Sequence, residues 1–236
     1  MIGFLRYAFG WIIYMGWWGT GVVFSALLGV RFRPGNIYDR SGRGWGRGML
    51  RFSRIAVRVM GRERIPDSPV VYISNHASEI DIWALLAELP GSVRFVYKKG
   101  MDWIPLMGLA MRRARHIPIK RQVKSQAFSA YDEAAKLIQG GISAVVFAEG
   151  TRSRDGKLQP FKRGPFVLAI AAQVPVVPVF CENTYALLPK GRFSPKPGTI
   201  TVHIGEPIPT AGMRYDDRGD LAERTRKELI KMGASE

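Results

Sequence analysis

The sequence predicts an α/β fold with a mostly parallel central sheet flanked by helices, preceded by a pair of N-terminal helices. After residue 65, short apolar segments alternate with helical segments, as they do in proteins with parallel sheets. An uncharged apolar segment covers residues 7–30, and a periodic row of arginines follows it. We therefore divide the chain into an N-terminal helical region, residues 1–62, and an α/β domain, residues 63–236.

The composition is that of a globular chain with a strong positive charge. The chain has 236 residues, and its hydrophobic content of 47% excludes a disordered protein. Lysine and arginine total 35 against 19 acidic residues, and this net charge of +16 favours anionic lipid or nucleic acid as a partner. A single cysteine excludes an internal disulfide and multi-cysteine zinc sites, and we expect no metal site.

The first apolar segment has the length of a membrane helix. At ~1.5 Å per residue, a helix over residues 7–30 extends roughly 36 Å, against about 30 Å of hydrocarbon in a bilayer. Trp11, Trp17 and Trp18 favour the headgroup boundary, so that a helix lying in the interface is an equal alternative to a spanning one. A cleaved signal peptide fits poorly, because only Arg6 precedes the segment and no A-x-A site follows.

The arginine row predicts a second, amphipathic helix, which we expect to begin near Gly46 and to end near Arg62. Arginines recur every three or four residues and line one face: Arg43, Arg47, Arg51, Arg54, Arg58 and Arg62. Apolar residues line the opposite face: Trp45, Met49, Phe52, Ala56 and Val59. This pattern indicates binding to anionic membrane lipids, with an ordinary helix packed on a soluble core as the alternative. We expect no nucleic acid partner, because the preceding apolar segment would serve no purpose there.

Further along the chain, strands and helices alternate. Strands are expected at residues 70–74, 93–97, 116–119, 142–147, 176–180 and 200–204. Helices are expected at residues 78–89, 125–139, 166–173 and 217–232. Active sites in such sheets gather just past the carboxyl ends of the strands. Residues 75–81 (NHASEID) and residues 149–153 (EGTRS) both occupy such positions.

The first cluster pairs an imidazole with a carboxylate. On a regular helix His76 and Asp81 would point about 140° apart, so His76 must lie in the turn and Asp81 must reach back to it. Asp81 then fixes the tautomer of His76 and leaves its other nitrogen free to act as a base. The alternative is that Ser78 and Asp81 form a capping box and that Asp81 only satisfies the helix N-terminus.

The second cluster combines an acid, a flexible glycine, a hydroxyl and an arginine. Arg152 can clamp a phosphate with two hydrogen bonds, and backbone N–H groups around Gly150 can assist. Lysines and a further arginine follow at Lys157, Lys162 and Arg163 and make the neighbourhood electropositive. The alternative is a solvated turn after a strand, where charged residues and glycine are common.

The two clusters together resemble the glycerophospholipid acyltransferase family, above all its members that acylate 1-acylglycerol 3-phosphate. The resemblance lies in NH-x4-D followed by F-x-E-G-T-R-S, in this order, and covers roughly residues 65–210. Intermediate elements also agree: Lys98, Pro105, Gly108, Arg121 and the valine-proline segment at residues 174–179. Two positions depart from the family pattern. Ala148 replaces a usual proline, and His116, which we interpret as structural or as tuning substrate choice, replaces a usual glycine.

The resemblance implies an enzyme that moves an acyl chain from a thioester to the sn-2 hydroxyl of lysophosphatidate and gives phosphatidic acid. It implies His76 as base and Asp81 as its partner. The residues implied to bind substrate are Glu149, Gly150, Thr151, Arg152, Lys98 and Arg121. The co-substrate is acyl-CoA or acyl carrier protein, without another cofactor.

The implied location is the bacterial inner membrane, with the α/β acyltransferase domain on the cytoplasmic face. The alternatives are another acceptor, glycerol 3-phosphate or a lyso-ornithine lipid, or a non-catalytic basic membrane-binding protein. Cys181 as a thiol nucleophile is a competing mechanism; we interpret it as structural, because no histidine is near it in sequence.

Overall fold

The computed structural model describes residues 2–104, 107–119 and 124–236. Its helices are α1 (Ile2–Leu27), α2 (Ile37–Phe52), α3 (Ile80–Glu88), α4 (Met107–Arg113), α5 (Lys124–Gln139), α6 (Gly164–Ala172), α7 (Thr184–Leu187) and α8 (Arg218–Lys231). Its strands are β1 (Ile55–Met60), β2 (Val71–Ser74), β3 (Val93–Lys98), β4 (Ile117–Ile119), β5 (Ser143–Phe147), β6 (Val176–Glu182) and β7 (Gly198–Ile204). The strands and helices expected after residue 65 are present, with ends shifted by a few residues.

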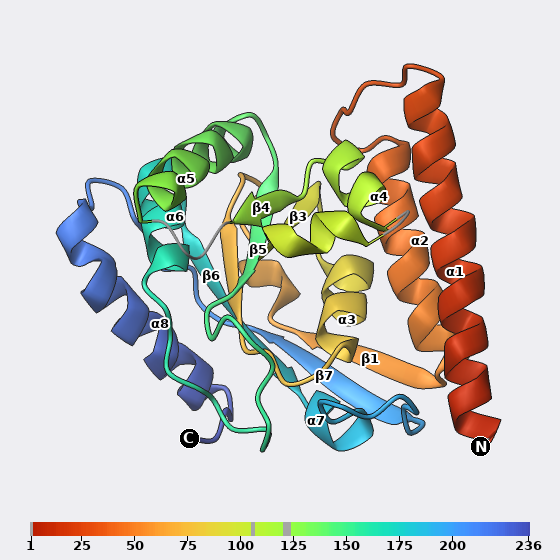
Figure 1. Cartoon of the computed structure of the whole chain (residues 1–236). Helices are drawn as coiled ribbons and strands as arrows, with labels where there is room; N and C mark the ends of the chain where they lie inside the picture. The colour runs from red at the N-terminus through yellow and green to blue at the C-terminus, as the bar shows by residue number, and fades with distance from the viewer. Residues whose placement is uncertain (1, 105–106, 120–123) are drawn as a thin grey trace.

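The strands form one central sheet in the order β1-β7-β6-β2-β5-β3-β4 among the described residues (Figure 1). From β6 to β4 every neighbouring pair is parallel, and β7 with its parallel neighbour β1 runs the other way. The predicted α/β fold with a mostly parallel sheet is confirmed. Because β2 and β5 are parallel neighbours, the loops that follow Ser74 and Phe147 leave the same edge of the sheet.

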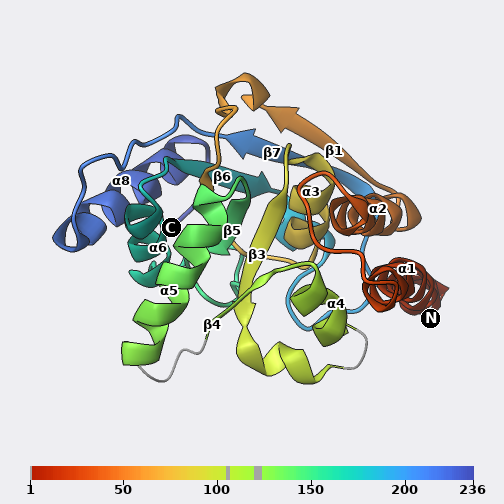
Figure 2. The same ribbon diagram turned by 90° about the horizontal axis from the view of Figure 1, so that it is seen from above.

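Helices cover both faces of this sheet (Figure 2). On one face, α5 and α6 pack over the inward residues of β2 and β5, such as Ile73 and Val146. On the other face, α3 packs over Tyr72 and Phe95 and is covered in turn by Met49 of α2. Helix α1 lies outermost on α2 and also contacts α4. The N-terminal helices therefore form an outer layer over the α3 face.

The predicted arginine-faced helix through Arg62 is wrong beyond Phe52. Helix α2 ends there, the chain turns through Arg54 with φ of 56°, and residues 55–60 form β1, which pairs with β7. Ile55, Val57 and Val59 alternate with exposed residues, as expected for a strand at the edge of a sheet. Pairing of this strand with β7 therefore outweighs the helical spacing of the arginines. The division of the chain at residue 62 stays a prediction, and β1 lies on its N-terminal side.

The start of α2 also differs from the prediction, because the glycines near it allow close packing. The helix begins at Ile37, where Asn36 caps it by accepting a hydrogen bond from the Tyr38 backbone N–H at 3.2 Å. A Cβ on Gly46 would lie 2.6 Å from the Trp83 carbonyl oxygen of α3, and one on Gly44 would overlap the Trp18 ring of α1. Glycine is therefore the residue that lets α2 fit between these two helices.

The apolar first segment, which is expected either to span a membrane or to lie in its interface, forms α1. Within the described residues, no helix combines the length and the apolar character that crossing a membrane requires. Apolar side chains nevertheless stand exposed along α1, and Trp17, Phe24 and Leu27 keep 73%, 63% and 77% of their surface accessible.

Candidate active site

His76 and Asp81 meet at the carboxyl end of β2. The His76 Nδ1 atom lies 2.9 Å from the Asp81 Oδ2 atom, and the side chains are 13% and 0% exposed. An ionised carboxylate only accepts hydrogen bonds, so Nδ1 is the donor and Nε2 keeps its lone pair. The predicted contact between the imidazole and the carboxylate is thus present in the structure, and the catalytic roles of the two residues stay a prediction.

The same carboxylate also binds the turn that precedes α3, so an orienting role and a structural role of Asp81 do not exclude each other. Its Oδ2 atom accepts hydrogen bonds from the backbone N–H groups of Ala77 at 2.8 Å and Ser78 at 2.9 Å. Its Oδ1 atom is buried and has no hydrogen-bond partner among the described residues. Since the backbone N–H groups hold the carboxylate in place, it can in turn hold the imidazole.

Phe147, at the end of β5, fixes the plane of the imidazole. The two rings are stacked, with centroids 3.8 Å apart and planes 11° from parallel. No role for Phe147 was predicted from the sequence. Its place at the last position of the strand before Glu149 is the feature that could have indicated a contact with the site. Asn75 was missed as well: its amide bonds both the N–H and the carbonyl of Cys181 and ties the loop to β6.

Glu149 joins the two clusters through the backbone. Its Oε1 atom accepts the His76 N–H at 2.7 Å and its Oε2 atom accepts the Gln159 N–H at 3.0 Å, while the residue is 3% exposed. Burial raises the pKa of Glu149 to about 7, although these two N–H groups favour the charged form. The Ser153 N–H adds a hydrogen bond to the His76 carbonyl at 2.7 Å. Glu149 therefore links the histidine loop, through Oε1, to the segment that contains Gln159, through Oε2.

Arg152 lies beside the histidine loop and is paired with Glu79. Its Nη1 atom is 3.0 Å from the Glu79 Oε1 atom, and both side chains are about a third exposed or less. Lys190 donates from Nζ to the Thr151 hydroxyl and to the Arg152 carbonyl, both at 3.1 Å. Gly150 adopts φ of 74°, a left-handed conformation that glycine reaches without strain. This loop thus presents cationic groups next to His76.

A cavity of about 920 Å³ begins at these residues and reaches beneath the N-terminal helices. Its polar end is lined by His76, Lys98, Gly150, Thr151, Arg152 and Lys162. Its remaining walls are largely apolar and come from α1 to α4, with Trp18, Val22, Tyr38, Trp45, Leu86 and Met111 among them. The arrangement places the His76 imidazole at the junction between an electropositive region and an apolar chamber.

The structure brings most of the predicted substrate-binding residues to this cavity. Lys98, Gly150, Thr151 and Arg152 line it, whereas Glu149 is not among the described residues that do. Its carboxylate serves the backbone contacts given above. Arg121, with Pro105 of the family pattern, lies outside the described residues.

Two further side chains singled out in the sequence are neutral, the partly buried His116 and the buried Cys181. The His116 Nδ1 atom accepts the Phe95 N–H at 2.9 Å, and burial next to Arg94 lowers its pKa to about 3. His116 also lines the cavity, so it remains a candidate for tuning substrate choice. Burial raises the pKa of the Cys181 thiol, which disfavours the thiolate that a nucleophile requires.

Comparison with known proteins gives one consistent family. The family described as Acyltransferase matches residues 56–182. A 1-acyl-sn-glycerol-3-phosphate acyltransferase of Limnanthes douglasii is 35% identical over 195 residues, which are 82% of this chain and 68% of the relative. The alpha form of that enzyme from Homo sapiens is 36% identical over 178 residues, 75% of this chain and 63% of the relative.

Among solved structures, the 1-acyl-sn-glycerophosphate acyltransferase PlsC of Thermotoga maritima superimposes with a TM-score of 0.80. The sequences are 28% identical, and the match covers 100% of this chain and 96% of that chain. This chain spans about two thirds of the length of the curated relatives given above, and nearly the full length of the solved structure.

Proposed function

We propose that this chain, which belongs to the Acyltransferase family, transfers an acyl chain from a thioester to the sn-2 hydroxyl of 1-acylglycerol 3-phosphate, giving phosphatidic acid. The observation that carries the proposal is the His76–Asp81 pair, which lies where the cationic loop meets the apolar chamber. A lipid that carries a phosphate, a free hydroxyl and an acyl chain matches the cationic loop, the His76–Asp81 pair and the apolar chamber, in that order. The names of the relatives support the same acceptor.

The reaction requires a base but no covalent enzyme intermediate, because a thioester is already activated. His76 takes the hydroxyl proton at Nε2, and Asp81 stabilises the imidazolium that forms. The acceptor oxygen attacks the thioester carbonyl carbon, the carbon–sulfur bond breaks, and the departing thiolate takes the proton from His76. Stacking on Phe147 keeps the imidazole aimed throughout these steps.

The acceptor phosphate binds at the cationic loop. Arg152 is a fork-shaped donor suited to phosphate, and a phosphate that approaches it competes with the Glu79 carboxylate. Lys98 and Thr151 line the same end of the cavity. Arg152, Lys98 and Thr151 are therefore the proposed headgroup residues. Gly150 shapes the loop beside them, and its N–H donates to the Phe147 carbonyl at 3.0 Å.

The acyl chain of the donor occupies the apolar chamber beneath the helices. The chamber is lined by aliphatic and aromatic side chains, which favour a hydrocarbon chain over water. The carrier, coenzyme A or acyl carrier protein, stays outside, and the basic surface of the chain suits the negative charge of both.

The lipid acceptor implies that the protein works at a membrane surface. The exposed apolar side chains of α1 recur at Phe9, Ile12, Ile13, Trp17 and Phe24, on one side of the helix. We infer that this face lies in the membrane interface and that the catalytic loops face the cytoplasm of a bacterium. The alternative acceptors, glycerol 3-phosphate and a lyso-ornithine lipid, belong in the same assay.

The test is thiol release from an acyl-CoA as a function of added lysophosphatidate. The wild-type chain is expected to release thiol only with the acceptor, and His76→Ala is expected to lose about 10²–10⁴-fold in turnover. The matched control is His203→Ala, because His203 also lies 2.9 Å from a carboxylate, that of Glu182, at a strand outside the cavity lining. Full activity of His76→Ala, or equal loss in both variants, contradicts the proposed role of His76.

A further inference from the structure

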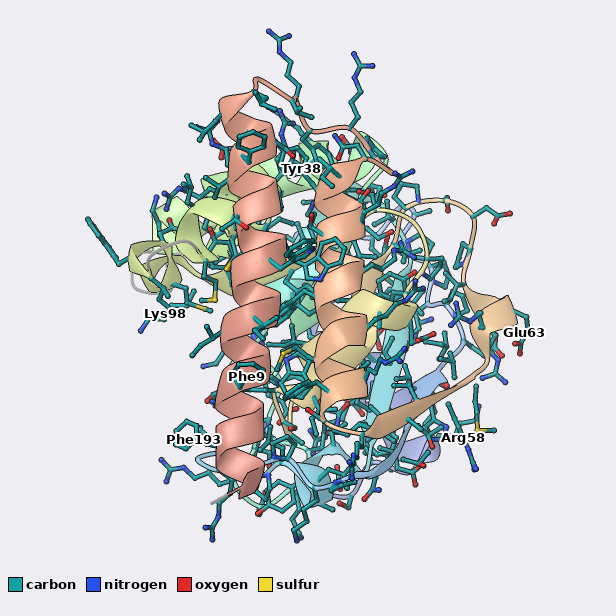
Figure 3. The ribbon with its side chains drawn as sticks, turned by 90° about the vertical axis from the view of Figure 1, so that its right-hand side faces the viewer. Phe9, Tyr38, Arg58, Glu63, Lys98 and Phe193 are labelled. Carbon is teal, nitrogen blue, oxygen red and sulfur yellow. The ribbon has the colours of Figure 1, made fainter. Side chains whose placement is uncertain are left out.

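A second cavity, of about 590 Å³, lies at the far end of the helix pair. It is lined by five arginines, namely Arg31, Arg33, Arg112, Arg113 and Arg115, together with Phe32, Tyr38 and the end of α1. Tyr38 lines both this cavity and the apolar chamber, so the two cavities adjoin at this residue. Figure 3 places Tyr38 at the end of the helix pair opposite to Phe9.

The positive charge of this cavity is not balanced within the described part of the chain. Arg112 contacts Asp102, with its Nη1 atom 3.7 Å from the carboxylate and 3.1 Å from the carbonyl oxygen. The other four arginines of the lining have no carboxylate within ion-pair distance among the described residues, and no acidic residue lines the cavity. Like charges held together around a concave surface repel one another until an anion binds between them.

The cavity is built on an ordered scaffold. The Phe32 ring carries the buried Arg94 guanidinium at 4.5 Å and the Arg115 guanidinium at 5.6 Å, and it packs on Tyr38 at 6.2 Å. The Tyr38 hydroxyl donates a hydrogen bond to the Val30 carbonyl at 2.7 Å. These contacts fix the loop between α1 and α2 against α4, so the arginines surround a preformed space.

Exposed apolar side chains adjoin the arginines. Phe24, Leu27, Leu28 and Val30 are 63%, 77%, 68% and 42% exposed, at the last turns of α1 and directly before Arg31. A soluble phosphate or nucleotide would leave these apolar side chains exposed to water. A membrane phospholipid matches both parts, with its phosphate between the arginines and its acyl chains along α1.

We propose that this arginine cavity is a second lipid site, distinct from the catalytic cavity, which holds the phosphate of an anionic membrane phospholipid. The site fixes the end of the helix pair at the depth of the headgroups. The inference rests on the proposed function, because a bilayer acceptor is what brings the chain to the membrane. The ligand differs from the acceptor in that its hydroxyl groups take no part in the reaction.

The experiment measures binding of the full chain to phosphatidylcholine vesicles with and without phosphatidylglycerol, at constant ionic strength. Phosphatidylglycerol is neither the substrate nor the product of the proposed reaction. The site variant is Arg33→Gln with Arg115→Asn, where asparagine tolerates the positive φ of 59° at residue 115. Phosphatidylglycerol is expected to increase the vesicle affinity of the wild-type chain. In the site variant this increase is expected to be smaller by about tenfold or more.

The matched control is Arg58→Gln with Arg54→Asn, which also removes two exposed charges, one of them at a positive φ of 56°. Figure 3 shows Arg58 on the other side of α2 from α1, away from Tyr38. In the control variant the increase in affinity caused by phosphatidylglycerol is expected to fall by less than about threefold. Equal losses in the two variants reduce the effect to general surface charge and overturn the site. Equal binding of the wild-type chain to vesicles with and without phosphatidylglycerol overturns the assignment to an anionic lipid.

Folding and catalysis are followed separately. The site variant is expected to keep its thermal unfolding midpoint and its turnover with a short-chain lysophosphatidate that is dissolved as monomers. A loss of that turnover shows a damaged fold or catalytic cavity and overturns the distinct site. Failure of the proposed function appears elsewhere, as full activity in His76→Ala, and leaves the vesicle comparison intact.

Discussion

The loops of the active site and helix α1 distribute polar and apolar groups in opposite ways. In the loops, the carboxylates of Asp81 and Glu149 are buried, and each accepts backbone N–H groups that hold it in position. On α1, Trp17 and Phe24 are largely exposed. Buried polar groups with partners indicate a site that is already organised within the chain. An exposed apolar face indicates that its surroundings come from outside the chain, and the surroundings proposed for α1 are a bilayer.

The largest effect is expected from removing the charge of the buried carboxylate. Asp81→Asn keeps the size of the side chain but leaves the imidazole tautomer unspecified and its cation unstabilised. We expect turnover to fall by about 10²–10⁴-fold in the thiol-release assay. The thermal unfolding midpoint reports whether the turn before α3 survives. A folded Asp81→Asn chain with wild-type turnover would show that Asp81 only holds this turn.

A smaller effect is expected from placing charge on the apolar face of α1. Trp17→Glu with Phe24→Glu should weaken binding to vesicles by roughly 100-fold, because two large apolar side chains no longer enter the interface. The unfolding midpoint should change little, since both side chains are exposed. Met60→Glu with Ile230→Glu is the matched control at exposed apolar residues of β1 and α8. Equal weakening of vesicle binding in the two double variants would contradict the proposal that the apolar face of α1 enters the membrane interface.

The smallest effect is a pH dependence of stability at Glu149. Because burial raises its pKa from 4.5 to about 7, the folded chain binds this proton more tightly than the unfolded chain does. The contribution of the protonated form to stability is therefore complete below about pH 4.5 and is lost as the pH rises through about 7.

Urea unfolding of the wild type and of Glu149→Gln at several pH values within that window checks this prediction. The difference in unfolding free energy between the two chains, wild type minus variant, should decrease as the pH rises. Parallel pH profiles would mean that Glu149 ionises in the folded chain as it does in the unfolded one.

Much of the α/β domain and of its site could be predicted from local patterns. The apolar runs that became β2 and β5 carried their own strand signals, and their loops held His76, Asp81 and Arg152. Parallel pairing of these strands then brings the loops together at one edge of the sheet. The edge strand β1 was not predicted, because its arginines follow a helical spacing while its β-branched residues follow that of a strand.

The sequence by itself determined the order of most strands and helices after residue 65, the basic and apolar character of the N-terminal region, and the pairing of His76 with Asp81. Each of these depends on residues close in the chain, where periodicity and turn chemistry act directly. Only the tertiary structure decided that Glu149 holds the histidine loop, that Phe147 supports the imidazole, and that arginines from two distant segments surround one cavity. Those contacts join residues far apart in the chain. The pairing of β2 with β5 brings Glu149 and Phe147 to His76, and the packing of α1 with α2 and α4 brings the arginines together.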